Sequence, residues 1–307
     1  MITYKELSSL ENDLGYDAKI LYGVSNHISS HYRKVILPKH KGGSRTLYVP
    51  DKLLKSIQRQ IAQRLLSMEE ISPFATAYRV GGSTLRNAAP HAGMPMLLKL
   101  DIKNFFDHIT YPMVKHKVFP AEKYSESNRI LLSLLCIYKD ALPQGAPTSP
   151  WISNIIMKDF DDVVGQWCCA RGIIYTRYCD DMSFSGEIDK RELVDLVTLE
   201  LRKHGFFLNK KKTVFVKQGQ RMNVTGVVVN SAPNIPADYR RALRQELYFC
   251  QKFGVEDHLA KIGAEISAKD YVKSLLGKVC YALFISPNDK DLNHYKTVLM
   301  QMIKKLG

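Results

Sequence analysis

The sequence has no long apolar segment. No run in its 307 residues approaches the roughly 20 apolar residues that a membrane-spanning helix needs, and Met1 to Glu6 lack the basic-then-apolar plan of a secretory signal. Internal repeats, low-complexity tracts and long linkers are also absent. None of the six cysteines form a Cys-x-x-Cys pair, so nothing favours a zinc site. These absences predict a cytoplasmic protein that does not bind membranes and whose cysteines are small buried thiols.

Acidic residues are scarce relative to basic ones. The chain has 30 Asp and Glu against 44 Lys and Arg, which gives a net charge of +14. Residues 31–68 hold nine basic residues and one acidic residue, and residues 201–250 hold ten and two. Basic side chains release counterions when they neutralise phosphates, so this imbalance favours a polyanionic partner. The two basic segments predict two walls of a groove, although solvated surface is the simpler interpretation of any charge run.

Apolar spacing predicts a mixture of strands and helices. Strands are expected at 34–37 and 45–49, joined by a turn at 41–44, at 96–102, and at 173–178 and 182–185 around a turn at 179–181. Helices are expected from Asp51 to residue 67, over 150–168, and through most of the chain after Pro236. Ser149 is the predicted N-cap of the second helix, with Pro150 at its first position.

Three carboxylates stand out in this pattern. Asp101 ends a predicted buried strand, and Asp180 and Asp181 are adjacent at a predicted hairpin turn. A single Asp at such a place is usually a turn former. Adjacent carboxylates repel each other unless a cation lies between them, and two-metal phosphoryl transfer needs carboxylates from separate strands. The residues therefore predict a site for two Mg²⁺ ions, which prefer hard oxygen ligands.

Four segments, in the expected order, resemble motifs of reverse transcriptases. Tyr178-Cys179-Asp180-Asp181 resembles their Tyr-x-Asp-Asp box, and Leu100 to Phe106 resembles their first carboxylate motif. Leu142 to Pro150, followed by Asn154, resembles the Pro-Gln-Gly segment. His204 to Asn209 and Lys210 to Thr213 look like the next motif downstream.

Two further segments resemble those of bacterial retron reverse transcriptases. Asn87 to His91 fits Asn-Ala-x-x-His, and Val224 to Gly226 fits Val-Thr-Gly. The resemblance is strong over residues 30–230. It implies an α+β right-hand polymerase fold: fingers at 1–95 with part of 110–140, a palm of antiparallel sheet backed by helices at 96–230, and a helical thumb or RNA-recognition region at 231–307.

The resemblance also implies an activity and partners. Such an enzyme is an RNA-directed DNA polymerase that copies part of its cognate structured non-coding RNA, using dNTPs. It starts from the 2′-hydroxyl of a branching guanosine and makes branched multicopy single-stranded DNA, an RNA–DNA product. Family members commonly act in anti-phage defence with a separate effector protein.

Matching positions give candidate site residues. The catalytic and metal ligands are Asp101, Asp180 and Asp181, and Cys179 is expected to fit beneath the primer end. Candidate nucleotide-binding residues are Arg45, whose planar guanidinium suits phosphate, Lys39, Phe106, Gln144, Gly145 and Lys212. Phe106 would clash with a ribose 2′-hydroxyl; the alternative is a core residue beside Phe105. Lys211 is an alternative to Lys212 as proton donor to pyrophosphate. Candidate RNA or primer contacts are Asn87, His91, Tyr178, Thr225, Gly226, Arg240, Arg241 and Arg244.

The last three arginines have helical spacing, which places them near one face opposite Leu243 and Leu247. They would grip structured RNA by its phosphates, or form a solvated face. His91 also has a purely structural alternative.

Three other functions remain open. Another bacterial reverse transcriptase, diversity-generating or group II-like, would keep the chemistry, but residues 87–91 and 224–226 argue against it. A palm-fold nucleotidyl cyclase would not need the Pro-Gln-Gly segment or the basic segments. A non-catalytic RNA-binding protein on a palm fold would not need all three carboxylates.

Overall fold

The computed structural model describes residues 3–38 and 43–306. The predicted nucleotide contact Lys39 and the first half of the predicted turn at 41–44 lie outside these residues. The chain separates into two compact units, one made of Met1–Gly82 and Leu98–Phe215 and the other of Ser83–Leu97 and Val216–Gly307. The predicted division into fingers, palm and thumb stays a prediction.

The first unit begins with helices and a two-stranded hairpin. These elements are α1 (Leu7–Leu14), α2 (Ala18–Asn26), the 3₁₀ turn η1 (Ile28–His31), β1 (Tyr32–Pro38) and β2 (Ser44–Pro50). The antiparallel strands pair Leu37 with Arg45, as the sequence predicts.

The helix predicted from Asp51 is confirmed over α3 (Lys52–Gln60). Asp51 caps it, because its carboxylate accepts a 2.9 Å hydrogen bond from the Leu54 amide. Beyond Gln60 the predicted helix changes geometry. It continues as the π-helical turn η2 (Ile61–Leu65) and the 3₁₀ turn η3 (Leu66–Met68).

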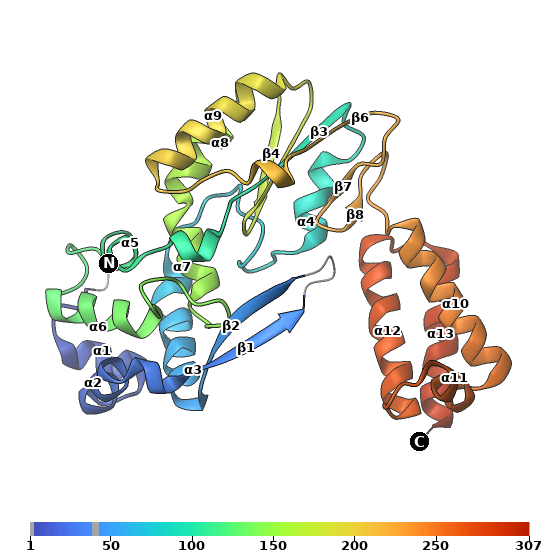
Figure 1. Cartoon of the computed structure of the whole chain (residues 1–307), viewed down its shortest axis with the longest axis horizontal. Coiled ribbons are helices and arrows are strands. Elements are labelled where there is room, and N and C mark those ends of the chain that lie inside the picture. Colours follow the sequence, from blue (N-terminus) through green and yellow to red (C-terminus); the bar gives the residue numbers. More distant parts are fainter. Residues whose placement is uncertain (1–2, 39–42, 307) are drawn as a thin grey trace. The chain divides into compact units, whose positions relative to one another are not determined.

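A four-stranded sheet carries the predicted carboxylates. Its strands are β3 (Met96–Asp101), β4 (Ile174–Tyr178), β5 (Asp181–Ser185) and β6 (Val214–Lys217), in the order β4-β5-β3-β6. Strands β4 and β5 form an antiparallel hairpin in which Tyr178 pairs with Asp181. This confirms the strands predicted at 96–102, 173–178 and 182–185. Helix α8 (Lys158–Cys169) packs beside β4 and against α9 (Lys190–Lys203), as Figure 1 shows.

Shorter elements complete the first unit. They are η5 (Phe105–His108), α5 (Tyr111–Met113), η6 (Val114–Val118), α6 (Glu126–Cys136), α7 (Ser149–Ile156) and η7 (Lys210–Lys212). The core beneath them is continuous, and fully buried aromatic side chains, including Phe119, Phe160 and Phe184, contribute to it.

The helix predicted over 150–168 is two helices, α7 and α8, which meet at Met157. The predicted N-cap is also wrong, because Thr148 holds the cap position and Ser149 is the first helical residue. Instead of capping, the Ser149 hydroxyl donates a 2.7 Å hydrogen bond to the Pro143 carbonyl. Pro150 is consequently the second helical residue, and the preceding loop is tied back to the start of α7.

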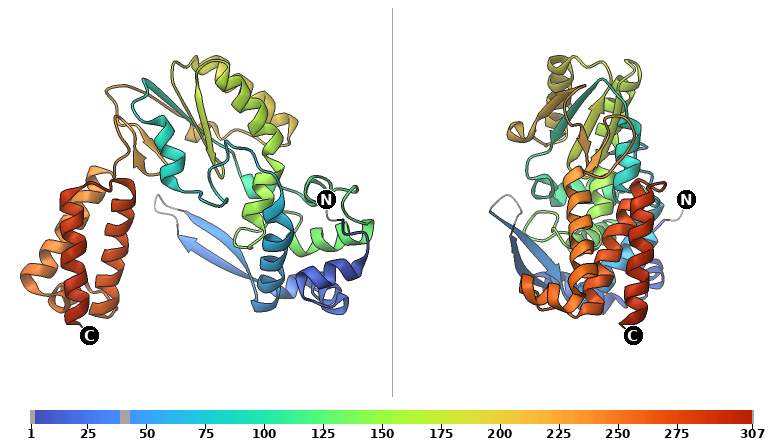
Figure 2. Two further views of the ribbon diagram at one scale, coloured as in Figure 1. Left: turned by 180° about the vertical axis from the view of Figure 1, so that it is seen from behind. Right: turned by 90° about the vertical axis from the view of Figure 1, so that its right-hand side faces the viewer.

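The second unit has its own core. It contains α4 (Thr84–Ala88), the 3₁₀ turn η4 (Ala89–His91), the short hairpin β7 (Asn223–Val224) and β8 (Val227–Val228), and four helices. These are α10 (Ala237–Phe253), α11 (Val255–Ile262), α12 (Ala268–Ile285) and α13 (Lys290–Lys305), of which α10, α12 and α13 run side by side (Figure 2). The helices predicted after Pro236 are confirmed. Among the helices described, none is both long and apolar enough to cross a membrane.

Candidate active site

Asp101 lies at the end of β3, where its carboxylate is almost fully buried at 3% exposure. One oxygen accepts a 2.6 Å hydrogen bond from Lys212 Nζ, and the other accepts a 2.9 Å bond from the Asn209 amide. The Asn209 backbone also donates to the Asp101 carbonyl at 2.8 Å. Residues 209–212 therefore hold this carboxylate at the end of β3.

The other two carboxylates lie at the turn between β4 and β5. Cys179 and Asp180 form a two-residue connection, because Tyr178 and Asp181 still pair. The Ile102 amide donates a 3.0 Å hydrogen bond to the Asp180 carbonyl, which brings this turn beside the end of β3. Cys179 is buried and has a positive φ of 61°, which its small side chain accommodates within the tight turn.

The electrostatics show that negative charge is crowded here. Burial, followed by repulsion from Asp101, raises the pKa of Asp180. Desolvation of the carboxylate is the largest cause that raises the pKa of Asp181, to about 6, and repulsion from Asp180 and Asp101 adds to it. The hydrogen bond to Asp101 raises the pKa of Lys212, which stays a cation. Lys212 and the nearby Lys99 supply two positive charges against three carboxylates, so the site keeps an excess of negative charge.

The donor chemistry suits a divalent cation. Three carboxylates offer the hard oxygen ligands that Mg²⁺ prefers. Among the described residues no group of three or more His, Cys, Asp and Glu side chains is arranged as a preformed metal cage. The Asp101 carboxylate is instead bound by Lys212 and Asn209.

A cavity of about 650 Å³ opens above the carboxylates. Its lining includes many of the predicted site residues, from the β1–β2 hairpin, the sheet and the loop before α7: Arg45, Asp101, Phe106, Gln144, Tyr178, Cys179, Asp180, Asp181 and Lys212. Cavities of a few hundred to about 1,000 Å³ are typical of sites that hold small ligands. Tyr78, which sequence reasoning did not select, also lines this cavity.

The loop at Gln144 and Gly145 forms one wall by packing on β2. The Tyr48 amide donates a 3.1 Å hydrogen bond to the Gln144 carbonyl. Gly145 has a φ of 119°, and a Cβ added there would lie 3.1 Å from the Tyr48 carbonyl oxygen. Glycine suits this backbone conformation and this close approach. The absence of a side chain at position 145 therefore lets the loop pack closely on β2.

Phe106 and Phe105 occupy different environments. Phe105 is 3% exposed and packs on Phe206 in the core. Phe106 is half-buried and lines the cavity together with Gln144 and Asp101. Its ring centroid lies 5.4 Å from that of Phe105, so Phe106 both packs against the core and lines the cavity, and its contact with the sugar stays a prediction.

The two segments that resemble retron enzymes meet in the second unit. The Asn87 amide donates a 3.3 Å hydrogen bond to the Thr225 hydroxyl, which donates to the Thr84 carbonyl at 3.3 Å. Thr225 and Gly226 form the β7–β8 turn, with φ values of 45° and 86°. A β-branched residue rarely adopts a positive φ, and these side-chain bonds hold Thr225 in it.

Asn87 and His91 are fully buried. Burial lowers the pKa of His91 to about 4, so the ring is neutral at pH 7. The predicted direct contact of these two side chains with RNA does not fit this burial, because RNA would have to reach the interior. Gly226 is exposed at the tip of the turn, where a partner can reach its backbone.

The predicted arginines lie on α10. Arg241 and Arg244 are exposed and Leu243 and Leu247 are buried, but the predicted placement on opposite faces is wrong, because at about 100° per residue Leu247 lies roughly 20° from Arg240 around the helix. Arg240 forms an ion pair with Asp289 at 2.5 Å. The three arginines and Arg221 line a second cavity, of about 440 Å³.

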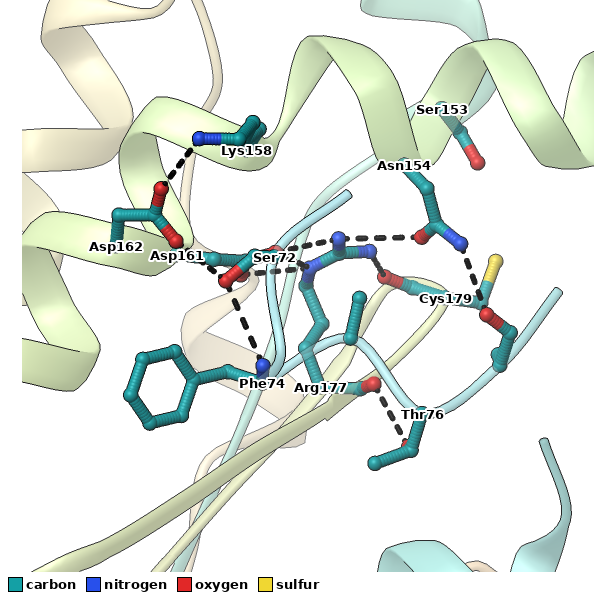
Figure 3. A network of polar contacts seen from close by, with 12 residues as sticks. Ser72, Phe74, Thr76, Ser153, Asn154, Lys158, Asp161, Asp162, Arg177 and Cys179 are labelled. Carbon is teal, nitrogen blue, oxygen red and sulfur yellow. Dashed lines mark hydrogen bonds and ion pairs between the residues drawn. The ribbon is translucent and has the colours of Figure 1, made fainter. Parts of the chain in front are cut away.

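Sequence reasoning missed a buried polar network beneath the β4–β5 turn. Arg177, on β4, is fully buried and forms an ion pair with Asp161 of α8. It also donates to Asn154 of α7 and to the Cys179 carbonyl (Figure 3). A charged residue inside an apolar strand, next to the paired carboxylates, was the available signal; its partners lie too far away in the sequence to be read from the local pattern.

Comparison with known proteins decides the family. The family model "Reverse transcriptase (RNA-dependent DNA polymerase)" matches residues 37–229. The chain is 32% identical over 223 residues to the retron Ec86 reverse transcriptase of Escherichia coli, covering 70% of this chain and 68% of that protein. The chain belongs to the retron reverse transcriptases. This retron reverse transcriptase is an RNA-directed DNA polymerase, and its right-hand α+β fold is confirmed with its family.

A second retron enzyme agrees with this assignment. The retron Mx65 reverse transcriptase of Myxococcus xanthus is 31% identical over 294 residues, covering 86% of this chain and 68% of the relative. Among solved structures, apo telomerase from Candida tropicalis matches with a TM-score of 0.48 and 12% identity, over 97% of this retron reverse transcriptase and 64% of the telomerase chain.

Proposed function

We propose that this retron reverse transcriptase copies part of a cognate structured RNA into branched single-stranded DNA, in anti-phage defence, with its reaction centre at the cavity above Asp101, Asp180 and Asp181. The observation that carries this proposal is that one cavity joins those carboxylates to Arg45, Phe106 and Gln144. This set supplies anionic ligands, a cation for phosphate, an aromatic ring and polar groups in one place.

Each side chain has a task that follows from its position. The Arg45 guanidinium binds the triphosphate of the incoming dNTP, because a planar fork matches phosphate oxygens. The Phe106 ring lies beneath the sugar and excludes a 2′-hydroxyl. The loop at Gln144 and Gly145 contacts the nucleotide. Its close packing on Tyr48 fixes the position of the loop for this contact.

The carboxylates would hold two Mg²⁺ ions. When bound, such ions activate the attacking hydroxyl and stabilise the charge on the transferred phosphoryl group. Burial and repulsion between the carboxylates raise the pKa values of Asp180 and Asp181. Added positive charge would stabilise their ionised forms. Lys212, already a cation beside Asp101, would donate a proton to the departing pyrophosphate.

The second unit would select the RNA. Exposed Arg241 and Arg244 present positive charge toward a phosphate backbone, which suits structured RNA because its deep groove cannot be read by side chains. Buried Asn87 supports the turn at Thr225 and Gly226, so the retron-like segments would act by presenting that turn rather than by direct contact from Asn87 or His91.

Sequencing the nucleic acid that co-purifies with the expressed chain and its flanking non-coding region tests this proposal. We expect one RNA species covalently joined to DNA through a 2′–5′ linkage at a guanosine. Linear DNA without a branch, or copies of unrelated transcripts, would favour a diversity-generating or group II-like template instead.

A phage challenge tests the role in defence. We expect cells carrying the locus to resist at least one phage, and the Asp180→Asn locus to lose that resistance. Equal resistance of the two loci would show that DNA synthesis is not needed for it.

A further inference from the structure

Arg177 lies at the centre of a hydrogen-bond network that the polymerisation reaction does not use directly. Its guanidinium donates to both carboxylate oxygens of Asp161, at 2.6 to 3.0 Å. The remaining donors reach the Asn154 side-chain oxygen at 3.2 Å and the Cys179 backbone carbonyl at 2.9 Å (Figure 3). The side chains of Arg177 and Asp161 are both fully buried, so water does not compete for these bonds.

The partners of Arg177 are themselves fixed. Asp161 accepts a further hydrogen bond from the Tyr175 hydroxyl, at 2.7 Å. The Asn154 amide nitrogen donates to the backbone carbonyls of Ala77 and Tyr78, at 2.8 and 3.3 Å. One guanidinium thus connects α7, α8 and the β4–β5 turn, and through Asn154 it reaches the loop that carries Tyr78.

The network ends on two residues with unusual backbone conformations. Cys179 has a φ of 61° and Tyr78 a φ of 55°, values that residues other than glycine rarely adopt. The carbonyl of each is an acceptor in the network. Both residues also line the cavity above the carboxylates. Such conformations persist where the surroundings hold them, and they concentrate at functional sites.

The opposite charges of Arg177 and Asp161 allow both side chains to be buried. Burial alone would lower the pKa of Arg177, but the adjacent Asp161 carboxylate raises it above its ordinary value, so the guanidinium stays charged. A buried ion pair contributes little stability compared with apolar side chains of the same volume. We therefore expect the Arg177–Asp161 ion pair to matter mainly for the positions of the groups that Arg177 contacts.

We propose that Arg177 is a positioning residue that sets the orientation of Asp180 by holding the Cys179 carbonyl. The peptide group is planar, so fixing the Cys179 oxygen fixes the plane from which Asp180 begins. Asp161 and Asn154 orient the guanidinium for this task, and Asn154 brings Tyr78 into the same arrangement. The inference rests on the proposed metal-binding role of Asp180.

The substitution Arg177→Lys separates positioning from charge. Lysine keeps the cation beside Asp161, but its single ammonium cannot reproduce the planar fork that reaches the Asp161, Asn154 and Cys179 acceptors together. We expect kcat for single-nucleotide addition to fall about 10- to 100-fold, the range for a misplaced reacting group. The KM for dNTP and the affinity for RNA should change less than about twofold, because Arg45 and the second unit are untouched.

Arg129→Lys is the matched control. Arg129 is also buried, at 7% exposure, and donates to Glu126 and to the Phe119 and Lys115 carbonyls. It lies in α6, outside the cavity above the carboxylates. Its partner Glu126 is 58% exposed, so the loss of thermal stability should be smaller than in Arg177→Lys, and kcat should stay at the wild-type value.

Hydrogen exchange gives a readout that does not depend on catalysis. The Ile102 amide bonds to the Asp180 carbonyl, so the peptides that cover residues 98–104 and 174–185 should exchange faster in Arg177→Lys than in Arg129→Lys. Faster exchange with normal kcat would mean that Asp180 is held as proposed but is not catalytic. Unchanged exchange and unchanged kcat would overturn the positioning role.

Asn154→Ala covers the case in which Arg177→Lys does not fold. This variant removes one partner of Arg177 and both bonds to the Tyr78 loop, without leaving a buried charge unpaired. A fall in kcat of about 5-fold or more, with wild-type RNA affinity, supports the proposal. Wild-type kcat and exchange in folded Asn154→Ala would reject it.

Discussion

Gly145→Ala tests whether the loop before α7 is held at the right distance from β2. The new Cβ would lie 3.1 Å from the Tyr48 carbonyl oxygen, and the residue would keep a φ of 119°. A non-glycine residue in such a conformation costs about 1–3 kcal/mol. At about 2–4 °C per kcal/mol for a domain of this size, the melting temperature should fall by roughly 2–12 °C. If the loop moves away from Tyr48 to remove this close contact, Gln144 is displaced in the cavity.

The activity should fall more than the stability alone explains. Displacement of Gln144 by some tenths of an ångström should reduce kcat/KM for dNTP addition by about 10-fold, within the range for misplaced binding groups. Gly15→Ala is the control, because Gly15 has a φ of 71° but no atom within 4 Å of an added Cβ. Steady-state incorporation on an RNA template and thermal melting measure both effects. If the two variants lose similar stability and both keep full kcat/KM, the packing of Gly145 on Tyr48 does not shape the site.

Three further predictions follow from the site. Phe106→Ala should raise ribonucleotide relative to deoxyribonucleotide incorporation at least several-fold in single-nucleotide kinetics, and an unchanged ratio in folded protein would place the sugar contact elsewhere. Replacing Arg240, Arg241 and Arg244 with Gln should weaken cognate RNA binding and flatten its salt dependence by about 0.7–0.9 of a slope unit per lost phosphate contact. Arg241 and Arg244 alone should give most of this effect, because Arg240 is paired with Asp289; equal loss on a generic primer–template would indicate a nonspecific clamp. Asp181, with its pKa raised to about 6, should bind protons in competition with metal below that pH, so the Mg²⁺ concentration for half-maximal activity should rise as pH falls from 7.5 to 5.5. NMR titration of the metal-free protein checks the cause, and a pKa near 4 for Asp181 would contradict it.

Local patterns in the sequence predict much of the scaffold. Short, mainly apolar runs before Asp101 and before the pair Asp180–Asp181 predict the strands and the turn, because these features depend on neighbours in the chain. The Asp51 cap is predictable for the same reason.

What the sequence could not predict depends on distant partners. The Ser149 hydroxyl bonds to the Pro143 carbonyl rather than capping a helix, and Arg177 finds Asp161 across two elements. The burial of Asn87 and His91 follows from packing within the second unit, which a motif match does not encode.

The most direct test of the central claim is DNA synthesis by Asp180→Asn on a primed RNA template with Mg²⁺ and dNTPs. Asparagine keeps the size of the side chain and removes its charge, so the hairpin turn and RNA binding should be preserved. The proposed reaction centre predicts that dNTP incorporation falls to less than about 1% of wild type, within the range for losing a catalytic metal ligand, while RNA affinity stays within about twofold. Incorporation above a few per cent in a folded variant would show that Asp180 is not a ligand of the reaction centre.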